Sequence, residues 1–246
     1  MAEERPYTVL QNIFVGVLFI IIVLFTCYQE GYWTEVSVWL WIAIVLGFSI
    51  SIIVASRTST PRFVGLLFST FIFEYVKETV GITSNMWMYH GSGSTYITGV
   101  WLWVLAAVIM YFLTTWVIYP FLRRLKIPNI KVVGSVLLLI IFLIIPFTLG
   151  PYLEGAGVTF WIFYLLVLIL GIYWSYTMPV SLLLSVVLSA WIMSNISEYL
   201  GSVTCHIWTF TYDPTYPPIF LLFGCWPLEF LFQYAFSAFV ANEPLE

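Results

Sequence analysis

Long apolar segments separated by short polar breaks dominate the hydrophobic pattern of this 246-residue chain. A helix that crosses a bilayer needs about 20 mostly apolar residues, and the pattern predicts about eight such helices. Proline, glycine and charged residues mark the breaks between them, as expected where helices end. The predicted spans are Val9–Tyr28, Ser37–Ala55, Phe63–Val80, Ile97–Tyr119, Val132–Leu149, Val158–Tyr176, Val180–Ile196 and Ile219–Val240.

The composition supports a membrane protein surrounded by lipid. Hydrophobic residues make up 62% of the chain and charged residues only 8%, whereas a soluble domain carries about 25% charged residues. We therefore predict an all-α fold, a polytopic membrane bundle of about eight spans. The chain has no basic stripe of the kind that nucleic acid requires. Its three cysteines have no metal-ligand spacing, so no metal site is expected.

Lysine and arginine fall on one side of this predicted topology. Cytoplasmic loops of membrane proteins carry an excess of these residues, so we predict a multi-pass protein of the cell membrane with both termini in the cytoplasm. The eighth basic residue, Lys77, lies inside a predicted span. The seven residues on the cytoplasmic side are Arg5, Arg57, Arg62, Arg123, Arg124, Lys126 and Lys131.

The two halves of the chain resemble each other. The pattern predicts a tandem four-helix repeat, with one unit in residues 1–123 and the other in 124–246. Four helices are an even number, so both units keep one orientation and are related by a pseudo-two-fold axis along the membrane normal. Glu78, Gly81, Trp87, Tyr89 and Tyr96 in the first half correspond to Glu198, Gly201, Trp208, Phe210 and Tyr216 in the second.

Four acidic residues, Glu74, Glu78, Glu198 and Glu229, lie inside or at the ends of predicted spans. A charge at the centre of a membrane helix costs roughly 2.5–3.5 kcal/mol, and such residues are usually functional. Lys77 lies one turn from Glu74 and beside Glu78. Glu229 has no basic residue in its own span. We therefore expect it to be desolvated, to hold its proton and to act as a proton donor.

Acids among many aromatic residues suit one type of chemistry. Aromatic residues make up 20% of the chain, and a desolvated cation on an aromatic face gains about 2 kcal/mol. An apolar site that excludes water also protects a reactive cation from side reactions. Protonation of an alkene, followed by loss of a proton elsewhere, fits these features and needs no cofactor.

The segment from Glu198 to Phe236 resembles the lycopene cyclase domain, the small membrane carotenoid cyclase of archaea, actinobacteria and fungi. This family closes rings on linear carotenoids by an acid-initiated, redox-neutral isomerisation, so the resemblance implies a lipophilic isoprenoid or carotenoid substrate. It also implies that Glu229 is the essential acid. The residues that carry it are Glu198, Gly201, Trp208-Thr-Phe210, Asp213-Pro-Thr-Tyr216, Gly224 and Pro227-Leu-Glu229.

The same resemblance implies which residues line the site. In the second half these are Glu198, Trp208, Phe210 and Tyr216. In the first half they are Glu78, Trp87, Tyr89 and Tyr96.

The chain departs from the family pattern at two positions. Phe230 stands where the family has a second glutamate, and Ala106 stands where the first half would carry the motif acid. A lost acid can change the reaction or abolish it.

Two other functions remain open. Internal repeats and acids near the midplane also suit a small-molecule or proton-coupled transporter. The same apolar, aromatic interior suits a lipid- or pigment-binding protein without turnover. Conversion of a linear carotenoid would distinguish the enzyme from both.

Overall fold

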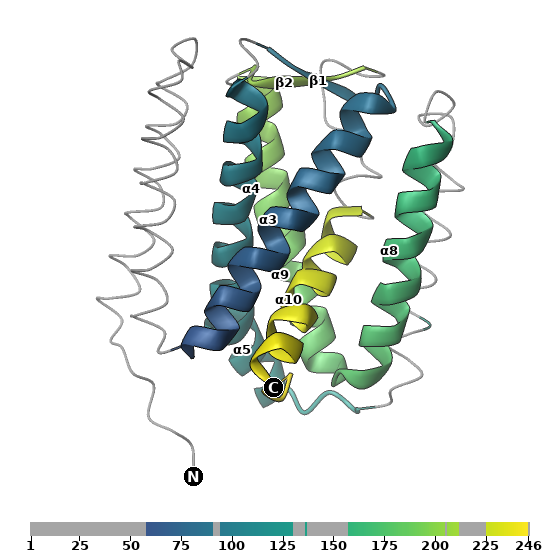
Figure 1. Cartoon of the computed structure of the whole chain (residues 1–246). Helices are drawn as coiled ribbons and strands as arrows, with labels where there is room; N and C mark the ends of the chain where they lie inside the picture. The colour runs from purple at the N-terminus through teal and green to yellow at the C-terminus, as the bar shows by residue number, and fades with distance from the viewer. Residues whose placement is uncertain are drawn as a thin grey trace.

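The computed structural model of the chain describes residues 58–90, 94–129, 136, 157–204, 206–211 and 225–245. The protein is mostly helical in these ranges, and Figure 1 shows the helices side by side in an upright bundle. The helices are α3 (Thr60–Thr83), α4 (Ser94–Phe112), α5 (Tyr119–Arg124), α8 (Val158–Thr177), α9 (Val180–Glu198) and α10 (Trp226–Ala241), with π-helical segments η1 (Leu113–Ile118) and η4 (Tyr199–Thr204).

The predicted spans that fall on described residues are helical. Phe63–Val80 lies within α3, and Ile97–Tyr119 lies within the continuous α4–η1–α5 helix. Val158–Tyr176 and Val180–Ile196 match α8 and α9. α10 covers the described part of Ile219–Val240. The remaining predicted spans, Val9–Tyr28, Ser37–Ala55 and Val132–Leu149, lie outside the described residues apart from Val136.

Among the described residues, three helices are long and apolar enough to cross a membrane: Leu102–Arg124, Val158–Thr177 and Val180–Val203. α10 has only 16 residues in its regular part. α3 is long enough, with 24 residues, but it contains the buried side chains of Arg62, Glu74, Lys77 and Glu78. Most of the buried charged side chains in the described residues therefore lie on α3 rather than on the three most apolar helices.

Local sequence explains where these helices begin and bend. Ser59 caps α3 by accepting a hydrogen bond from the Arg62 N–H, and Pro61 stands in the first turn, where its missing N–H costs nothing. The π-helical segment η1 comes directly before Pro120. A proline inside a helix clashes with the carbonyl four residues earlier, and a wider π turn relieves such a clash.

The expectation of an all-α chain is wrong at one place. Strands β1 (Trp87–Tyr89) and β2 (Trp208–Phe210) pair antiparallel, with Trp87 opposite Phe210, Met88 opposite Thr209 and Tyr89 opposite Trp208. This short ribbon lies across one end of the bundle (Figure 1). It joins the segments that follow α3 and η4, which are far apart in sequence.

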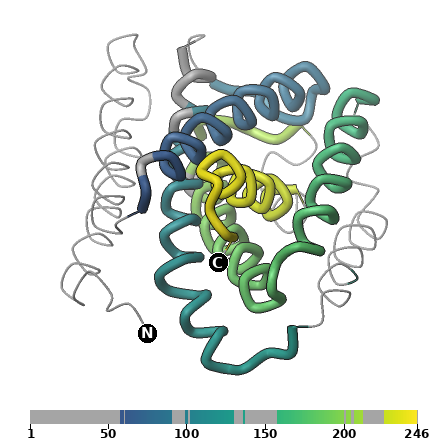
Figure 2. Tube along the Cα trace, turned by 60° about the horizontal axis from the view of Figure 1, so that its bottom comes forward, coloured from purple at the N-terminus to yellow at the C-terminus, as the bar shows by residue number. Residues whose placement is uncertain are grey.

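α10 is the central element of the described bundle. It packs against α3, α8 and α9 and also touches α4, and Figure 2 shows it enclosed by these helices. Its interior side chains include Phe230, Leu231 and Tyr234, each no more than 1% exposed. The acids on α3 and α10 therefore lie in the interior of the bundle.

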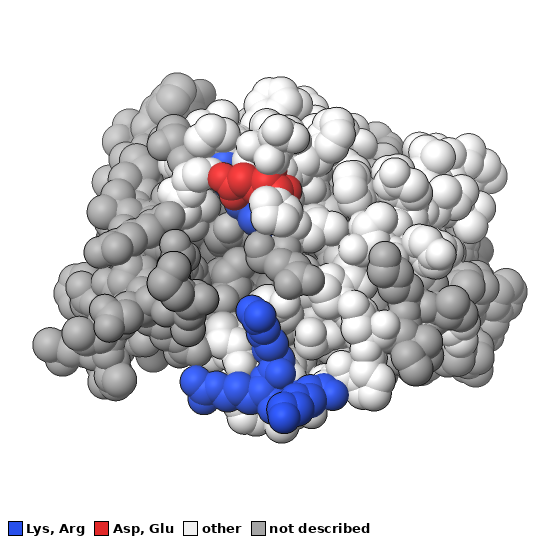
Figure 3. Space-filling model, turned by 90° about the horizontal axis from the view of Figure 1, so that it is seen from below, with Lys and Arg blue, Asp and Glu red and all other residues white. Residues whose placement is uncertain are grey.

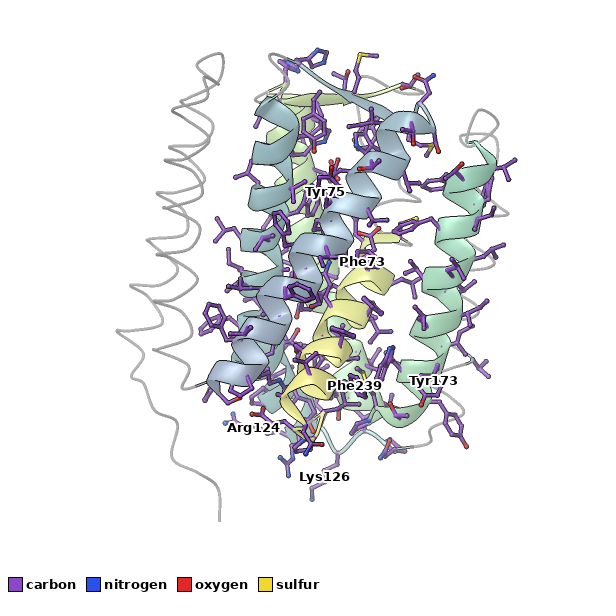
Figure 4. The ribbon with its side chains drawn as sticks, in the orientation of Figure 1. Phe73, Tyr75, Arg124, Lys126, Tyr173 and Phe239 are labelled. Atoms are coloured by element: carbon purple, nitrogen blue, oxygen red, sulfur yellow. The ribbon has the colours of Figure 1, made fainter. Side chains whose placement is uncertain are left out.

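The opposite end of the bundle carries the basic residues. Arg123 and Arg124 lie in the last turn of α5 and Lys126 follows it. Figure 4 shows Arg124 and Lys126 at the end away from the β ribbon, and Figure 3 shows blue basic side chains gathered on that face. At the same end, buried Arg62 pairs with Glu243 at 3.4 Å and lies between the rings of Tyr111 and Tyr234. The Ser59 hydroxyl also donates to Glu243. These contacts join the start of α3 to the segment after α10.

Substitution of Gly201 by alanine tests the packing beneath the ribbon. A Cβ at this position would lie 2.0 Å from a ring carbon of Trp208, so the indole must move. Overpacking of this kind costs roughly 1–3 kcal/mol, and we expect a lower thermal unfolding midpoint for detergent-solubilised Gly201→Ala. Gly157→Ala is the control, because its nearest neighbouring atom lies at 3.5 Å. Equal midpoints for Gly201→Ala and Gly157→Ala would contradict this packing.

Candidate functional site

Two aromatic donors hold Glu78, near the end of α3. The Trp87 indole N–H donates to Glu78 Oε2 over 2.8 Å, and the Tyr89 hydroxyl donates to the same oxygen over 2.9 Å. Asn85, with φ of 56°, reverses the chain after α3. Gly81 leaves room for the indole, because a Cβ there would lie 1.9 Å from a Trp87 ring carbon. Burial, together with the Glu78 carboxylate, raises the pKa of Tyr89 well above its usual range, so its hydroxyl stays a donor.

Glu198, at the end of α9, is held in a similar way. The Trp208 indole N–H donates to Glu198 Oε2 over 2.8 Å, and the Trp226 indole N–H donates to Oε1 over 2.9 Å. His206, with φ of 50°, reverses the chain, and Gly201 lies against the Trp208 ring. The same residue types at corresponding positions thus give the same local geometry on α3 and on α9.

The β ribbon brings these two carboxyl groups to one place. A small cavity lies beneath it, between the two helix ends. Six of the ten site residues predicted from sequence share this cavity. Its wall consists of Glu78, Trp87, Tyr89, Trp103, Glu198, Trp208, Phe210 and Trp226.

The Lys77 ammonium is the centre of the acidic cluster. Its Nζ lies 2.5 Å from Glu74, 3.3 Å from Glu78 and 3.8 Å from Glu229. The Lys77 side chain is 2% exposed, and its charge is shielded by two tryptophan faces. The ring centroids of Trp103 and Trp226 lie 4.1 Å and 4.4 Å from Nζ.

Glu229 meets a basic residue from a neighbouring helix. No Lys or Arg shares its own span, but α3 packs against α10 and places Lys77 beside it. Glu74 is also part of this arrangement, since Gln233 on α10 donates to it over 2.7 Å. Both carboxyl groups point into the bundle, at 3% and 4% exposure for Glu74 and Glu229.

Glu229 also faces a second small cavity between α3, α8 and α10. Apolar or aromatic side chains form most of its wall. Glu229 and Lys77 supply its charged groups. The wall consists of Lys77, Val80, Trp87, Phe160, Phe163, Tyr164, Val167, Cys225, Trp226 and Glu229.

Sequence reasoning missed several of these residues. On α8, Phe160, Phe163, Tyr164 and Val167 line one face of the helix, and their spacing of three and four residues was a usable signal. The contacts of Lys77 with Trp103 and Trp226 depend on tertiary packing that no local pattern contains. Of the predicted residues, Tyr216 lies outside the described ranges, and Tyr96 is described only in its backbone, near the start of α4.

In the described part of the chain, no group of three or more His, Cys, Asp and Glu side chains could hold a metal ion. Comparison of the chain with protein-family models, with curated proteins and with solved structures finds no match. The acidic and aromatic side chains themselves are therefore the basis for any functional conclusion.

Replacement of Trp208 by phenylalanine tests the hydrogen bond to Glu198. The aromatic ring remains, but a buried carboxyl loses one of its two N–H donors. Hydrogen bonds to charged groups contribute roughly 1.5–3 kcal/mol, so we expect lower stability to thermal unfolding in detergent.

Trp174→Phe is the matched control, because the Trp174 indole N–H has no hydrogen-bond partner in the part of the chain that the structure describes. The same substitution there should change the unfolding midpoint much less. If both variants lose the same stability, the Trp208–Glu198 hydrogen bond contributes little.

Proposed function

We propose that this chain is a multi-pass membrane enzyme that rearranges a linear isoprenoid hydrocarbon by acid catalysis, with ring closure as the reaction type. Glu229 is the acid. The observation that carries the proposal is the position of the Glu229 carboxyl, which faces an apolar cavity lined by aromatic rings. A hydrocarbon offers no polar group to bind, so an apolar wall with one acid is the site such a substrate needs.

The charge balance of the cluster supports an acid that holds its proton. Four carboxyl groups, those of Glu74, Glu78, Glu198 and Glu229, are buried in this part of the bundle with one ammonium, and each residue is no more than 4% exposed. Three of them lie within 3.8 Å of Lys77 Nζ, and the fourth, Glu198, accepts from the Trp226 indole that packs against Nζ. Unbalanced buried negative charge is very costly, and such groups become neutral instead. Glu78 and Glu198 each accept two hydrogen bonds from aromatic side chains. Glu229 has no such donors among the described residues and is the best candidate to carry a proton.

The chemistry balances without any added reactant. The Glu229 O–H proton adds to a terminal carbon–carbon double bond, and its oxygen keeps the bonding electrons as a carboxylate. The resulting carbocation attacks a second double bond and closes a ring. Loss of a proton from the ring then forms a new double bond, and the Glu229 carboxylate can take up that proton.

The aromatic wall suits a positively charged intermediate. Trp87, Trp226, Phe160, Phe163 and Tyr164 line the cavity, and cation–π attraction is strongest where water is absent. Exclusion of water also prevents hydration of the cation. The Lys77 ammonium lies against the rings of Trp103 and Trp226.

The proposal includes the architecture expected from sequence: about eight spans, with four-helix units in residues 1–123 and 124–246. The corresponding left-handed residues Asn85 and His206 support it, as do the Gly81–Trp87 and Gly201–Trp208 contacts. Arg124 and Lys126 (Figure 4) lie at the end of the bundle that also holds the C-terminus (Figure 1), which supports a cytoplasmic location for that end.

Expression in cells that accumulate lycopene tests the function. We expect ring-closed product from the wild-type chain, detected by absorbance and chromatography, and at least about a 100-fold loss in Glu229→Gln, because general acid catalysis contributes roughly 10²–10⁴-fold. Glu243→Gln makes the same chemical change at the other end of α10 and should keep activity. The membrane content of each variant is measured by immunoblot.

Two outcomes would contradict the proposal. If the wild-type protein accumulates in the membrane but no isoprenoid is converted, transport or binding becomes the better interpretation. If Glu229→Gln is as active as Glu243→Gln, the acid lies elsewhere.

A further inference from the structure

We propose that Lys77 is a positioning residue for the reaction: it orients the Glu229 carboxyl toward the apolar cavity and stabilises the carboxylate that forms as the proton leaves. This inference rests on the proposed function. Lys77 is not part of the motif that links the chain to carotenoid cyclases, and in sequence it resembles an ordinary partner of Glu74.

The contacts of Lys77 connect two helices. An ammonium has three N–H donors, and three carboxyl groups lie within 3.8 Å of Nζ. Glu74 and Glu78 belong to α3, like Lys77 itself, whereas Glu229 belongs to α10. The shorter distances to the α3 acids, 2.5 Å and 3.3 Å, fix the ammonium. Glu229, at 3.8 Å, is the acid that this fixed ammonium meets from the neighbouring helix.

The tryptophan faces restrict the ammonium further. Nζ lies 4.1 Å and 4.4 Å from the ring centroids of Trp103 and Trp226. The Trp226 indole N–H is in turn held by Glu198. The charge thus has a fixed position in a dry site, which is the condition under which it acts most strongly on a neighbouring group.

The cavity wall shows why Lys77 acts through Glu229. Lys77 and Glu229 both line the apolar cavity, but Glu74 and Glu78 do not. While Glu229 holds its proton, its attraction to Lys77 is that of a dipole to a charge. When the proton moves to the substrate, the O–H bond breaks, and the full charge of the carboxylate forms beside the ammonium. The interaction is stronger in the transition state than before it, and such interactions increase kcat rather than binding.

The test compares Lys77→Gln and Lys77→Ala with wild type as purified protein in detergent, with lycopene in mixed micelles. Gln keeps N–H donors but carries no charge. We expect kcat to fall about 100-fold in both variants while KM changes less than about threefold, as for loss of one preorganised electrostatic group. Lys126→Met, a change at an exposed lysine away from the site, should keep both constants.

Chemical rescue separates charge from volume. Lys77→Ala leaves space between the two tryptophans, and added propylammonium should restore at least about a tenth of the lost rate. Propanol has the same size but no charge and should restore none. Gel filtration and the thermal unfolding midpoint show whether each variant is folded, and Lys77→Gln answers the question if Lys77→Ala does not fold.

Three results are decisive. More than half of the wild-type kcat in Lys77→Gln, or equal rescue by propanol and propylammonium, would overturn the role of Lys77 and leave the proposed function intact. The absence of product from folded wild-type protein would instead contradict the proposed function. A fall in kcat that only propylammonium reverses supports both.

Discussion

The interior of this protein is arranged around one buried ammonium, that of Lys77, whose positive charge must be balanced by nearby acids. Lys77 is only 2% exposed, and carboxyl groups and tryptophan faces surround its ammonium. Those carboxylates in turn require donors. Trp87 and Tyr89 supply them to Glu78, Trp208 and Trp226 supply them to Glu198, and Gln233 supplies one to Glu74. The positions of two helices, the β ribbon and the start of α10 all follow from this one charge.

The tryptophans connect these polar contacts to the packing of the bundle. Each donating indole also has a ring that packs: Trp87 against Phe210 and Trp226, and Trp208 against Tyr89 and Trp103. A side chain at position 81 would collide with the Trp87 indole, and one at position 201 would collide with the Trp208 indole. Gly81 and Gly201 therefore leave the room that these rings need. A change in one tryptophan therefore affects a hydrogen bond and an aromatic contact together, and the two effects are not separable by truncation to alanine.

Sequence predicts the helices well and the site only partly, for physical reasons. A long apolar segment such as Val158–Tyr176 has a composition that is typical of a membrane-spanning helix and of few other structures. The three-residue strands at Trp87 and Trp208 are too short for periodicity to reveal them, and their partners are distant in the chain. The corresponding motifs name Glu78 and Glu198 as site residues, and both line one cavity. Lys77 and Glu229 could not be paired from sequence, because their contact depends on how α3 packs against α10.

The two segments that carry the corresponding motifs differ in charge. At the corresponding spacing, Ser194 and Ser197 stand where α3 has Glu74 and Lys77, and Ala106 stands where α10 has Glu229. Glu78 and Glu198, by contrast, each accept a hydrogen bond from the indole of a following tryptophan, and a glycine leaves room for each indole. A second buried ammonium with its acids would require the same costly desolvation again. In the described bundle the ammonium therefore has its acids between α3 and α10, and there Glu229 lines the apolar cavity.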